Sequence, residues 1–542
     1  MARRSIELLY LLPIVAFVAL FALLPAADLF ATALSASGGL SGIRAVMTDP
    51  LDRLSIANSL VQGGLSAALA VAVGYPTGIT LGRYAWSGRG VVRSLLLVPF
   101  LLPSLIVVLG IQDLFNPGGA VTAVLPSAVF FSRGIPGIVA ANLLFNVPIV
   151  ALFTSTGCAG GSRELEESVA TLGGTPGRAY LDAWGRPTWV GAAAGGLLTF
   201  LFSALSFAPP LILGGTRYYT VEARIYALDK GTALAPNAAG VLAFLMVLLF
   251  LPVTIAYLLL LGRLRARPGR RASALRPFPR RSALGIGLAA ITASVLIAEG
   301  ALLGAVLYRS VRPTGAGSWG GAWGTLFSGA TSAKLGLPVT SALGNTLLFA
   351  VGAAAVTLLL GIAAGHAVAR RPQRAGTVGL VLFVPLLLSP VVLAFALASF
   401  WRPLLGGEES VWALVLVSQS VLALPFAVQS LEVPLAGLPA GASESAQTLG
   451  ASPWTAYLDV DLPRVRDGVV TAGLFALALG LGEFTATYFL VTPQFTTVPV
   501  ALYDLSCCSR AFPLTDALAG LLLLLCLVTF AGLAIGGRRV EL

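Results

Sequence analysis

The side chains that could carry out metal, acid–base or nucleophilic chemistry are few and scattered along this 542-residue chain. The single histidine is His366, and no Gly-x-x-x-x-Gly-Lys-Ser/Thr segment occurs that would hold nucleotide phosphates as a P-loop. The four cysteines show no metal-ligand spacing such as Cys-x-x-Cys: Cys158, Cys507, Cys508 and Cys526. We therefore expect no catalytic residue, no metal site and no cofactor on this chain, which should not be an enzyme.

Three carboxylates, Asp113, Glu299 and Glu483, lie inside strongly apolar segments. An acid at the middle of a membrane costs about 2.5–3.5 kcal/mol on insertion-based scales, so such groups usually face a protein interior or a pathway. Local pairing with an arginine is the main alternative for Glu299. For Glu483 two interpretations stand: a substrate-pathway residue, which would offer a cation a weak transient site, or an interhelical hydrogen-bonding group.

The strongest pattern is a polar motif that occurs twice, 277 residues apart. The first copy is Glu-Ser-Val-Ala-Thr-Leu-Gly at 167–173, and the second is Glu-Ser-Ala-Gln-Thr-Leu-Gly at 444–450. Each copy lies in a long polar segment between apolar ones. We name residues 157–188 the first motif loop and residues 431–467 the second motif loop.

Each motif loop is predicted to present a short helix that turns back into a second one. Gly173 and Gly450 permit a turn that a side chain would obstruct. Pro176 and Pro453 suit the first turn of the following helix, and Ser452 is a suitable cap for it.

The elements that position these loops are apolar segments long enough to cross a membrane. The chain is 57% hydrophobic and only 11% charged, roughly half the charge of a soluble protein. A helix needs about 20 apolar residues to span the bilayer, and only helices or closed barrels satisfy their own backbone there. We predict an all-α polytopic membrane protein with about twelve transmembrane helices, near 8–30, 57–82, 94–115, 135–156, 189–213, 237–262, 284–308, 343–369, 378–401, 411–430, 468–491 and 514–537.

The twelve predicted helices form two halves. Residues 1–262 carry six, residues 263–283 form a basic linker without an apolar run, and residues 284–542 carry the other six. Because six is even, the repeat is parallel, and a pseudo-two-fold axis along the membrane normal is expected. A translocation path should lie between the halves.

The net charge of +11 follows the positive-inside pattern rather than a nucleic-acid-binding one. Of the 34 Lys and Arg residues, 23 lie on the predicted side of both termini. We therefore expect a multi-pass protein of the plasma or inner membrane with both termini and both motif loops in the cytoplasm. The basic linker is expected to lie against anionic lipid headgroups.

The motif loops resemble the EAA loop of binding-protein-dependent ABC importers. That loop reads Glu-Ala-Ala, three residues, Gly, nine residues, then Ile-x-Leu-Pro. The second motif loop matches it at Glu444, Ala446, Gly450, Leu462 and Pro463.

The first motif loop keeps Glu167 and Gly173 but departs from the pattern elsewhere. Val169 replaces an alanine, and the segment 183–187 lacks the aliphatic pair before its final proline. With both loops in register, the whole chain resembles a fused permease of an ABC importer.

The resemblance implies a membrane subunit that forms the translocation path while ATP is bound and hydrolysed by a partner. In this family the EAA loop holds a coupling helix that docks on the ATP-binding subunit, and the span that carries Glu483 helps to line the path. One copy of the chain should assemble with two ATP-binding cassette subunits and one extracytoplasmic substrate-binding protein.

The expected substrate is thiamine or ferric iron. The segments 214–222 and 493–499, each followed by a tyrosine at Tyr226 or Tyr503, resemble the thiamine and ferric-iron branch of these permeases.

Two other classes of protein share some of these features. A secondary transporter driven by an ion gradient would also have twelve spans in two halves, but it would need titratable groups in several spans and no docking loop. A membrane enzyme would need a cluster of His, Asp or Cys residues that the sequence lacks.

Overall fold

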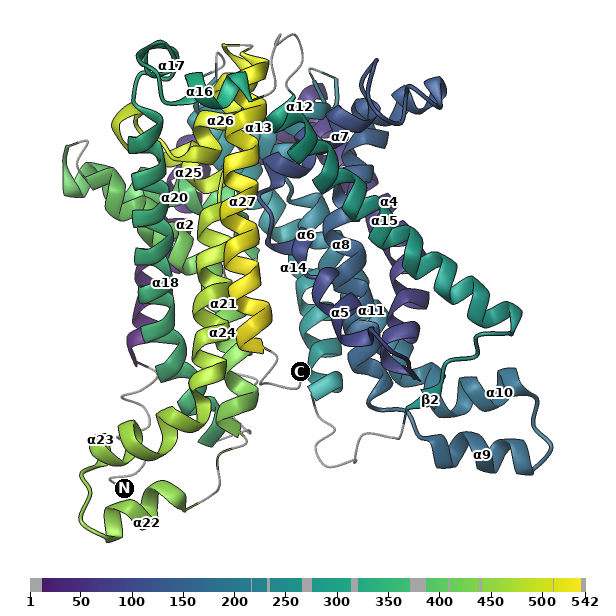
Figure 1. The fold of residues 1–542 in the computed structure, drawn as a ribbon. Helices are drawn as coiled ribbons and strands as arrows, with labels where there is room; N and C mark the ends of the chain where they lie inside the picture. The colour runs from purple at the N-terminus through teal and green to yellow at the C-terminus, as the bar shows by residue number, and fades with distance from the viewer. Residues whose placement is uncertain are drawn as a thin grey trace. The chain divides into compact units, whose positions relative to one another are not determined.

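The computed structural model of this chain is almost entirely helical (Figure 1). It describes residues 12–215, 217–231, 234–265, 275–312, 320–370, 387–407, 410–436, 438, 441–509 and 511–537. Within them, ten helices are long and apolar enough to cross a membrane: Leu12–Ala36, Pro50–Gly82, Gly134–Cys158, Pro176–Ala204, Pro236–Leu264, Ala283–Val311, Val339–Gly365, Val411–Leu431, Tyr457–Gly482 and Phe512–Gly532. The prediction of an all-α polytopic membrane protein is confirmed.

The other two predicted spans differ from these ten. The third, predicted at 94–115, is divided into α5 (Arg89–Leu95), α6 (Val98–Leu101) and α7 (Ser104–Phe115). Pro103 lies at the second division, and proline cannot donate the backbone hydrogen bond that would continue a helix. The ninth, predicted at 378–401, lies partly outside the described residues, where α20 (Pro390–Leu405) forms its later part.

One compact unit, which we name the first-loop unit, contains residues 33–100 and 104–309. Besides α5 to α7 it comprises α3 (Leu40–Thr48), α4 (Pro50–Gly82), β1 (Tyr84–Ala85), η2 (Pro126–Ser132), α8 (Gly134–Cys158), α9 (Arg163–Thr171), α10 (Pro176–Tyr180), η3 (Leu181–Gly185), α11 (Arg186–Ala204), α12 (Ala208–Leu213), α13 (Val221–Asp229), α14 (Pro236–Arg265), β2 (Arg276–Pro277) and α15 (Ala283–Val311).

The second-loop unit contains the described residues up to Thr32, residues 101–103 and those from Ser310 onward. Besides α20 it comprises η1 (Ala19–Leu23), α2 (Leu24–Ala36), α16 (Gly321–Leu326), α17 (Gly329–Leu335), α18 (Val339–Arg370), α21 (Val411–Ala436), α22 (Ala442–Thr448), α23 (Pro453–Ala456), η6 (Tyr457–Asp461), α24 (Leu462–Gly482), α25 (Thr485–Leu490), η7 (Pro493–Phe495), α26 (Val498–Cys507) and α27 (Phe512–Gly537).

The first long helix of each sequence half packs mainly in the unit formed by the other half. Helix α15 opens the second sequence half, yet its Val295 is buried with Ala70 and Val150 of the first. Conversely, Phe21 near the N-terminus contacts the ring of Trp401, with 5.6 Å between the ring centroids. The domain division at residues 262 and 284 was inferred from the sequence repeat and not from packing, and it stays a prediction.

Equivalent positions of the sequence repeat make the same contacts within each unit. The Asn58 side chain donates to the Tyr219 carbonyl at 3.0 Å, as Asn345 does to the Thr496 carbonyl at 3.0 Å. The next residues, Ser59 and Thr346, accept from the first amides of α13 and α26 at 3.0 and 2.8 Å. Each unit is interrupted at an equivalent place, between α11 and α12 or between α24 and α25. The segment that follows this break is therefore fixed in the same way in both units.

Glycines allow α4 to lie directly against α8 in the first-loop unit. A Cβ on Gly74 would come within 2.7 Å of the Val150 Cβ, and one on Gly82 within 2.6 Å of the Cys158 Sγ. Small residues spaced by four let membrane helices approach closely. This contact fixes the C-terminal end of α4, which in turn contacts the first motif loop.

Candidate functional site: the two motif loops

Both motif loops fold as a pair of short helices beyond the ends of the long ones (Figure 1). In the first, α9 is followed by α10, which continues through η3 into α11. In the second, α22 is followed by α23, then η6 and α24. The predicted projecting helices are present in both loops.

Side-chain caps begin both helices of the first loop and the second helix of the second loop. Ser162 accepts from the Leu165 amide at 3.1 Å at the start of α9, and Thr175 accepts from the Arg178 amide at 3.3 Å at the start of α10. Ser452 accepts from the Thr455 amide at 3.1 Å, so the predicted cap of the second loop is confirmed.

The motif glycines close the first helix of each loop in the same left-handed conformation. The φ angle is +81° at Gly173 and +98° at Gly450. The amide of Gly450 donates to the Gln447 carbonyl at 3.0 Å, and the next amide donates to the Ala446 carbonyl at 3.1 Å. The first loop repeats this pair of bonds, which ends a helix at a residue where glycine is strongly favoured.

A leucine is exposed immediately before each of these glycines. Leu172 is 87% exposed and Leu449 is 90% exposed. A single exposed apolar side chain is common on protein surfaces. What distinguishes these two leucines is that they occupy the same position in both motif loops. Neither leucine was predicted as a site residue, although the Thr-Leu-Gly triplet that the two motifs share could have indicated them.

The predicted motif residues differ in their surroundings. Glu167 forms an ion pair with Arg163 at 2.8 Å on an exposed face of α9, and this hydrogen bond raises the pKa of the Arg163 guanidinium. Glu444 lies in the first turn of α22. Leu462 packs against the buried cluster that includes Leu431 of α21, and Pro463 follows it in the first turn of α24. This pair anchors the returning end of the second loop.

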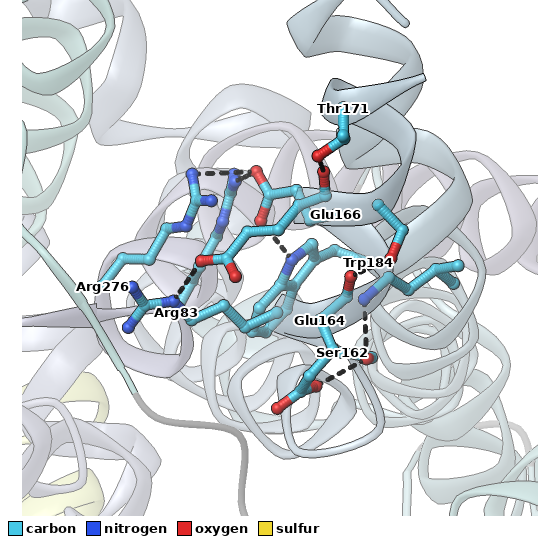
Figure 2. Close-up of polar contacts among 11 residues, drawn as sticks. Arg83, Ser162, Glu164, Glu166, Thr171, Trp184 and Arg276 are labelled. Atoms are coloured by element: carbon cyan, nitrogen blue, oxygen red, sulfur yellow. Dashed lines mark hydrogen bonds and ion pairs between the residues drawn. The ribbon is translucent and has the colours of Figure 1, made fainter. Parts of the chain in front are cut away.

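The acidic residue buried in the first loop is Glu166, which the sequence analysis did not single out. Figure 2 shows its carboxylate between Arg83, Arg276 and Trp184, three residues from separate segments. Successive helical residues point about 100° apart, so Glu166 and Glu167 face different surroundings. The nearby arginine and tryptophan gave no sequence signal, because their proximity depends on the fold.

Comparisons with known proteins agree with this architecture. The chain is 26% identical over 538 residues to the thiamine transport system permease protein ThiP of Brucella abortus, which covers 96% of this chain and 93% of that protein. It is 30% identical over 139 residues to the molybdenum transport system permease protein ModB of Escherichia coli, which covers 23% of this chain and 61% of that protein.

A shorter match joins the chain to a putative 2-aminoethylphosphonate transport system permease protein, PhnV, of Salmonella paratyphi A. The identity is 34% over 110 residues, 20% of this chain and 41% of that protein. No protein-family model matches the chain. The chain is thus similar to permease subunits of ABC importers, and in the case of ThiP over nearly its whole length. The resemblance on which the sequence analysis relied is therefore confirmed.

Glu483 lies in the break between α24 and α25. Its two carboxylate oxygens accept from the amides of Ala486 and Thr487, both at 2.8 Å, and from the Thr487 hydroxyl at 2.5 Å. These bonds cap α25 and give Glu483 a structural role within one helix break. Its second role, as a pathway residue, stays a prediction.

The other residues singled out in the permease sequence have mixed outcomes. Asp113 of α7 lies 3.8 Å from the Nε of Arg309 in α15. Glu299 is 5% exposed, and within the described residues its Oε1 has no hydrogen-bond partner. The alternative of an arginine pair for Glu299 thus finds no support there. The side chain of His366 lies outside the described residues.

Proposed function

We propose that this permease is the membrane subunit of an ATP-driven importer and that its two motif loops dock on two ATP-binding subunits. The observation that carries the proposal is the repeated tip: an exposed leucine followed by a glycine with positive φ, at the same place in both loops. On this proposal ATP is hydrolysed on the partner subunits, and a substrate-binding protein delivers substrate on the opposite, extracytoplasmic side. Both termini and both loops face the cytoplasm.

The helices behind the loops suit the transmission of movement. Residues 176–204 form one continuous helix from the first loop into the membrane, and residues 457–482 do the same for the second. Each contains a π-helical turn near its beginning, η3 or η6, a feature that is frequent at functional sites. Displacement of the second loop's tip would be passed along its helix to the break that Glu483 caps.

Thiamine is the substrate that we propose first, and ferric iron second. The match to the thiamine permease extends over nearly the whole chain, whereas the match to the molybdenum permease covers about a quarter of it. Uptake of labelled thiamine should be measured in vesicles that contain the permease and its ATP-binding and substrate-binding partners. Uptake should require internal ATP. Transport that persists without ATP and follows an ion gradient would favour a secondary transporter.

The assembly should contain a single copy of this permease. Because one chain supplies both motif loops, we expect native mass spectrometry of the purified complex to find one 55.7 kDa chain with two ATP-binding subunits and one substrate-binding protein. A complex that holds two copies of the permease would contradict this assignment.

A path role for Glu483 predicts that its charge matters more than its hydrogen bonds. In Glu483→Gln the amide oxygen still accepts from one of the two backbone amides, while the other amide faces the NH2 group and loses its acceptor, and the charge is lost. We expect severalfold lower uptake with unchanged expression and near-normal basal ATP hydrolysis.

Thr487→Val is the matched control for Glu483→Gln, since it removes one hydrogen bond and keeps the carboxylate. It should have the smaller effect on uptake. Equal uptake by the two variants would leave Glu483 with its capping role alone.

A further inference from the structure

Three donors converge on one buried carboxylate at the base of the first motif loop. The Oε1 atom of Glu166 lies 2.5 Å from the guanidinium of Arg83 and 3.1 Å from that of Arg276, and Oε2 accepts from the Trp184 indole at 2.7 Å (Figure 2). The side chains of Glu166 and Arg83 are only 7% and 9% exposed. A charge so well buried needs partners close by, and here they come from α4, the linker and η3.

Aromatic rings surround the more deeply buried cation. The Arg83 guanidinium lies over the rings of Tyr180, Tyr84 and Trp184, at 4.9, 5.4 and 5.4 Å from their centroids. Such faces attract a cation. The rings therefore hold the Arg83 guanidinium beside the first motif loop, although Arg83 shares the Glu166 carboxylate with Arg276.

The linker packs and hydrogen-bonds with the residues at the base of the first motif loop. The amide of Arg276 donates to the Arg83 carbonyl at 3.0 Å, and β2 pairs with β1 as parallel strands. The ring of Phe278 meets that of Tyr84 at 5.5 Å. Leu288, at the start of α15, is buried in the same cluster as Trp184. Four segments thus share one small core: the end of α4, the first motif loop, the linker and α15.

The sequence of the second motif loop does not repeat the acid and the indole of this arrangement at the equivalent positions. At the repeat distance of 277 residues, Glu166 corresponds to Ser443 and Trp184 to Asp461. Neither the acid nor the indole is repeated. The buried cluster of Glu166, Arg83, Arg276 and Trp184 is therefore a feature of the first loop, which is also the loop that departs from the EAA pattern.

We propose that Glu166 is a positioning residue for the first motif loop and that the linker, through Arg276, is a working part of that loop. The contacts hold α9 to the inner end of α4 and to the start of α15. A displacement of α9 would then reach α4 and α15 as well as α11. This inference rests on the docking role proposed above, and it gives the linker a part in coupling beyond that of a tether.

The packing half of the proposal is tested on the full chain without any partner. Hydrogen–deuterium exchange should be compared in peptides 163–172 and 275–282 for the wild type, Glu166→Gln and Arg276→Ala. Each substitution should raise exchange in both peptides by roughly tenfold or more, because it opens a shared contact. Arg280→Ala, at an exposed linker arginine, is the control and should change neither. A rise confined to the mutated segment would overturn the proposal.

The coupling half is tested in vesicles with the ATP-binding and substrate-binding partners. Arg276→Ala should lower substrate transported per ATP hydrolysed severalfold at normal expression, Arg276→Lys should restore part of it, and Arg280→Ala should match the wild type. If Arg276→Ala loosens both peptides but leaves transport per ATP unchanged, the contact only stabilises the fold and the proposal is wrong. Absence of ATP-dependent uptake by the wild type would instead refute the proposed function, and the coupling role of Arg276 with it.

Discussion

The double variant Leu172→Asp with Leu449→Asp should insert normally yet lose binding of its ATP-binding subunits. Both leucines are almost fully exposed at the loop tips, so replacing them leaves the packing of the permease untouched. In a docked complex each aspartate would enter an apolar contact. Two interface hot spots of about 2 kcal/mol each correspond to roughly a thousandfold loss of affinity.

The binding should be measured between detergent-solubilised permease and the purified ATP-binding subunit. Val124→Asp is the control, since Val124 is 86% exposed and lies between α7 and α8, at the opposite end of α8 from the first loop. If the double variant binds the ATP-binding subunit with an affinity within a few fold of the wild type, the two leucines are not part of the docking surface.

The second large effect is expected for Gly450→Pro. The native φ of +98° lies far from the value near −65° that proline requires, and proline also lacks the amide that bonds to Gln447. The turn must therefore rearrange, at a local cost of about 3 kcal/mol or more, whereas the long helices are unaffected. We expect uptake to fall at least tenfold while the partner still hydrolyses ATP.

Gly450→Asn separates conformation from side-chain bulk, because asparagine tolerates positive φ and a Cβ at this site would meet nothing within 4 Å. It should retain most of the uptake. Gly173→Pro should act in the same direction with a smaller loss, because the first loop departs from the EAA pattern and is braced at its base. Normal uptake by Gly450→Pro at normal expression would show that this turn has no part in coupling.

The long helices could be predicted because their length and apolar character are local properties of the sequence. Ten of the twelve predicted spans overlap them, but the fifth and eleventh, predicted at 189–213 and 468–491, are interrupted after Ala204 and after Gly482. The third span was wrong as a single helix, since Pro103 divides it and apolar character alone does not reveal where a helix ends. The exchange of α15 between sequence halves could not be predicted, because periodicity identifies a buried face and not its partner.

The same limit explains the site. The turn at Gly173 and Gly450 was predictable from residue type and from the repeat. Glu166 was not, because its burial depends on Arg83 and Arg276, which are far away in the sequence. The neighbouring Glu167 matched the family motif and proved to be an exposed residue paired within its own helix.

The exchange of helices also determines the order in which the permease can be made. The first-loop unit needs residues up to Arg309, so a ribosome must pass the linker and finish α15 before that unit has all its helices. Residues 12–32 pack with described residues from Ser310 onward, so this segment must wait in the bilayer until most of the chain has followed. Domains usually fold one after another during synthesis. Residues 12–32 therefore leave the ribosome long before most of the residues that they pack against.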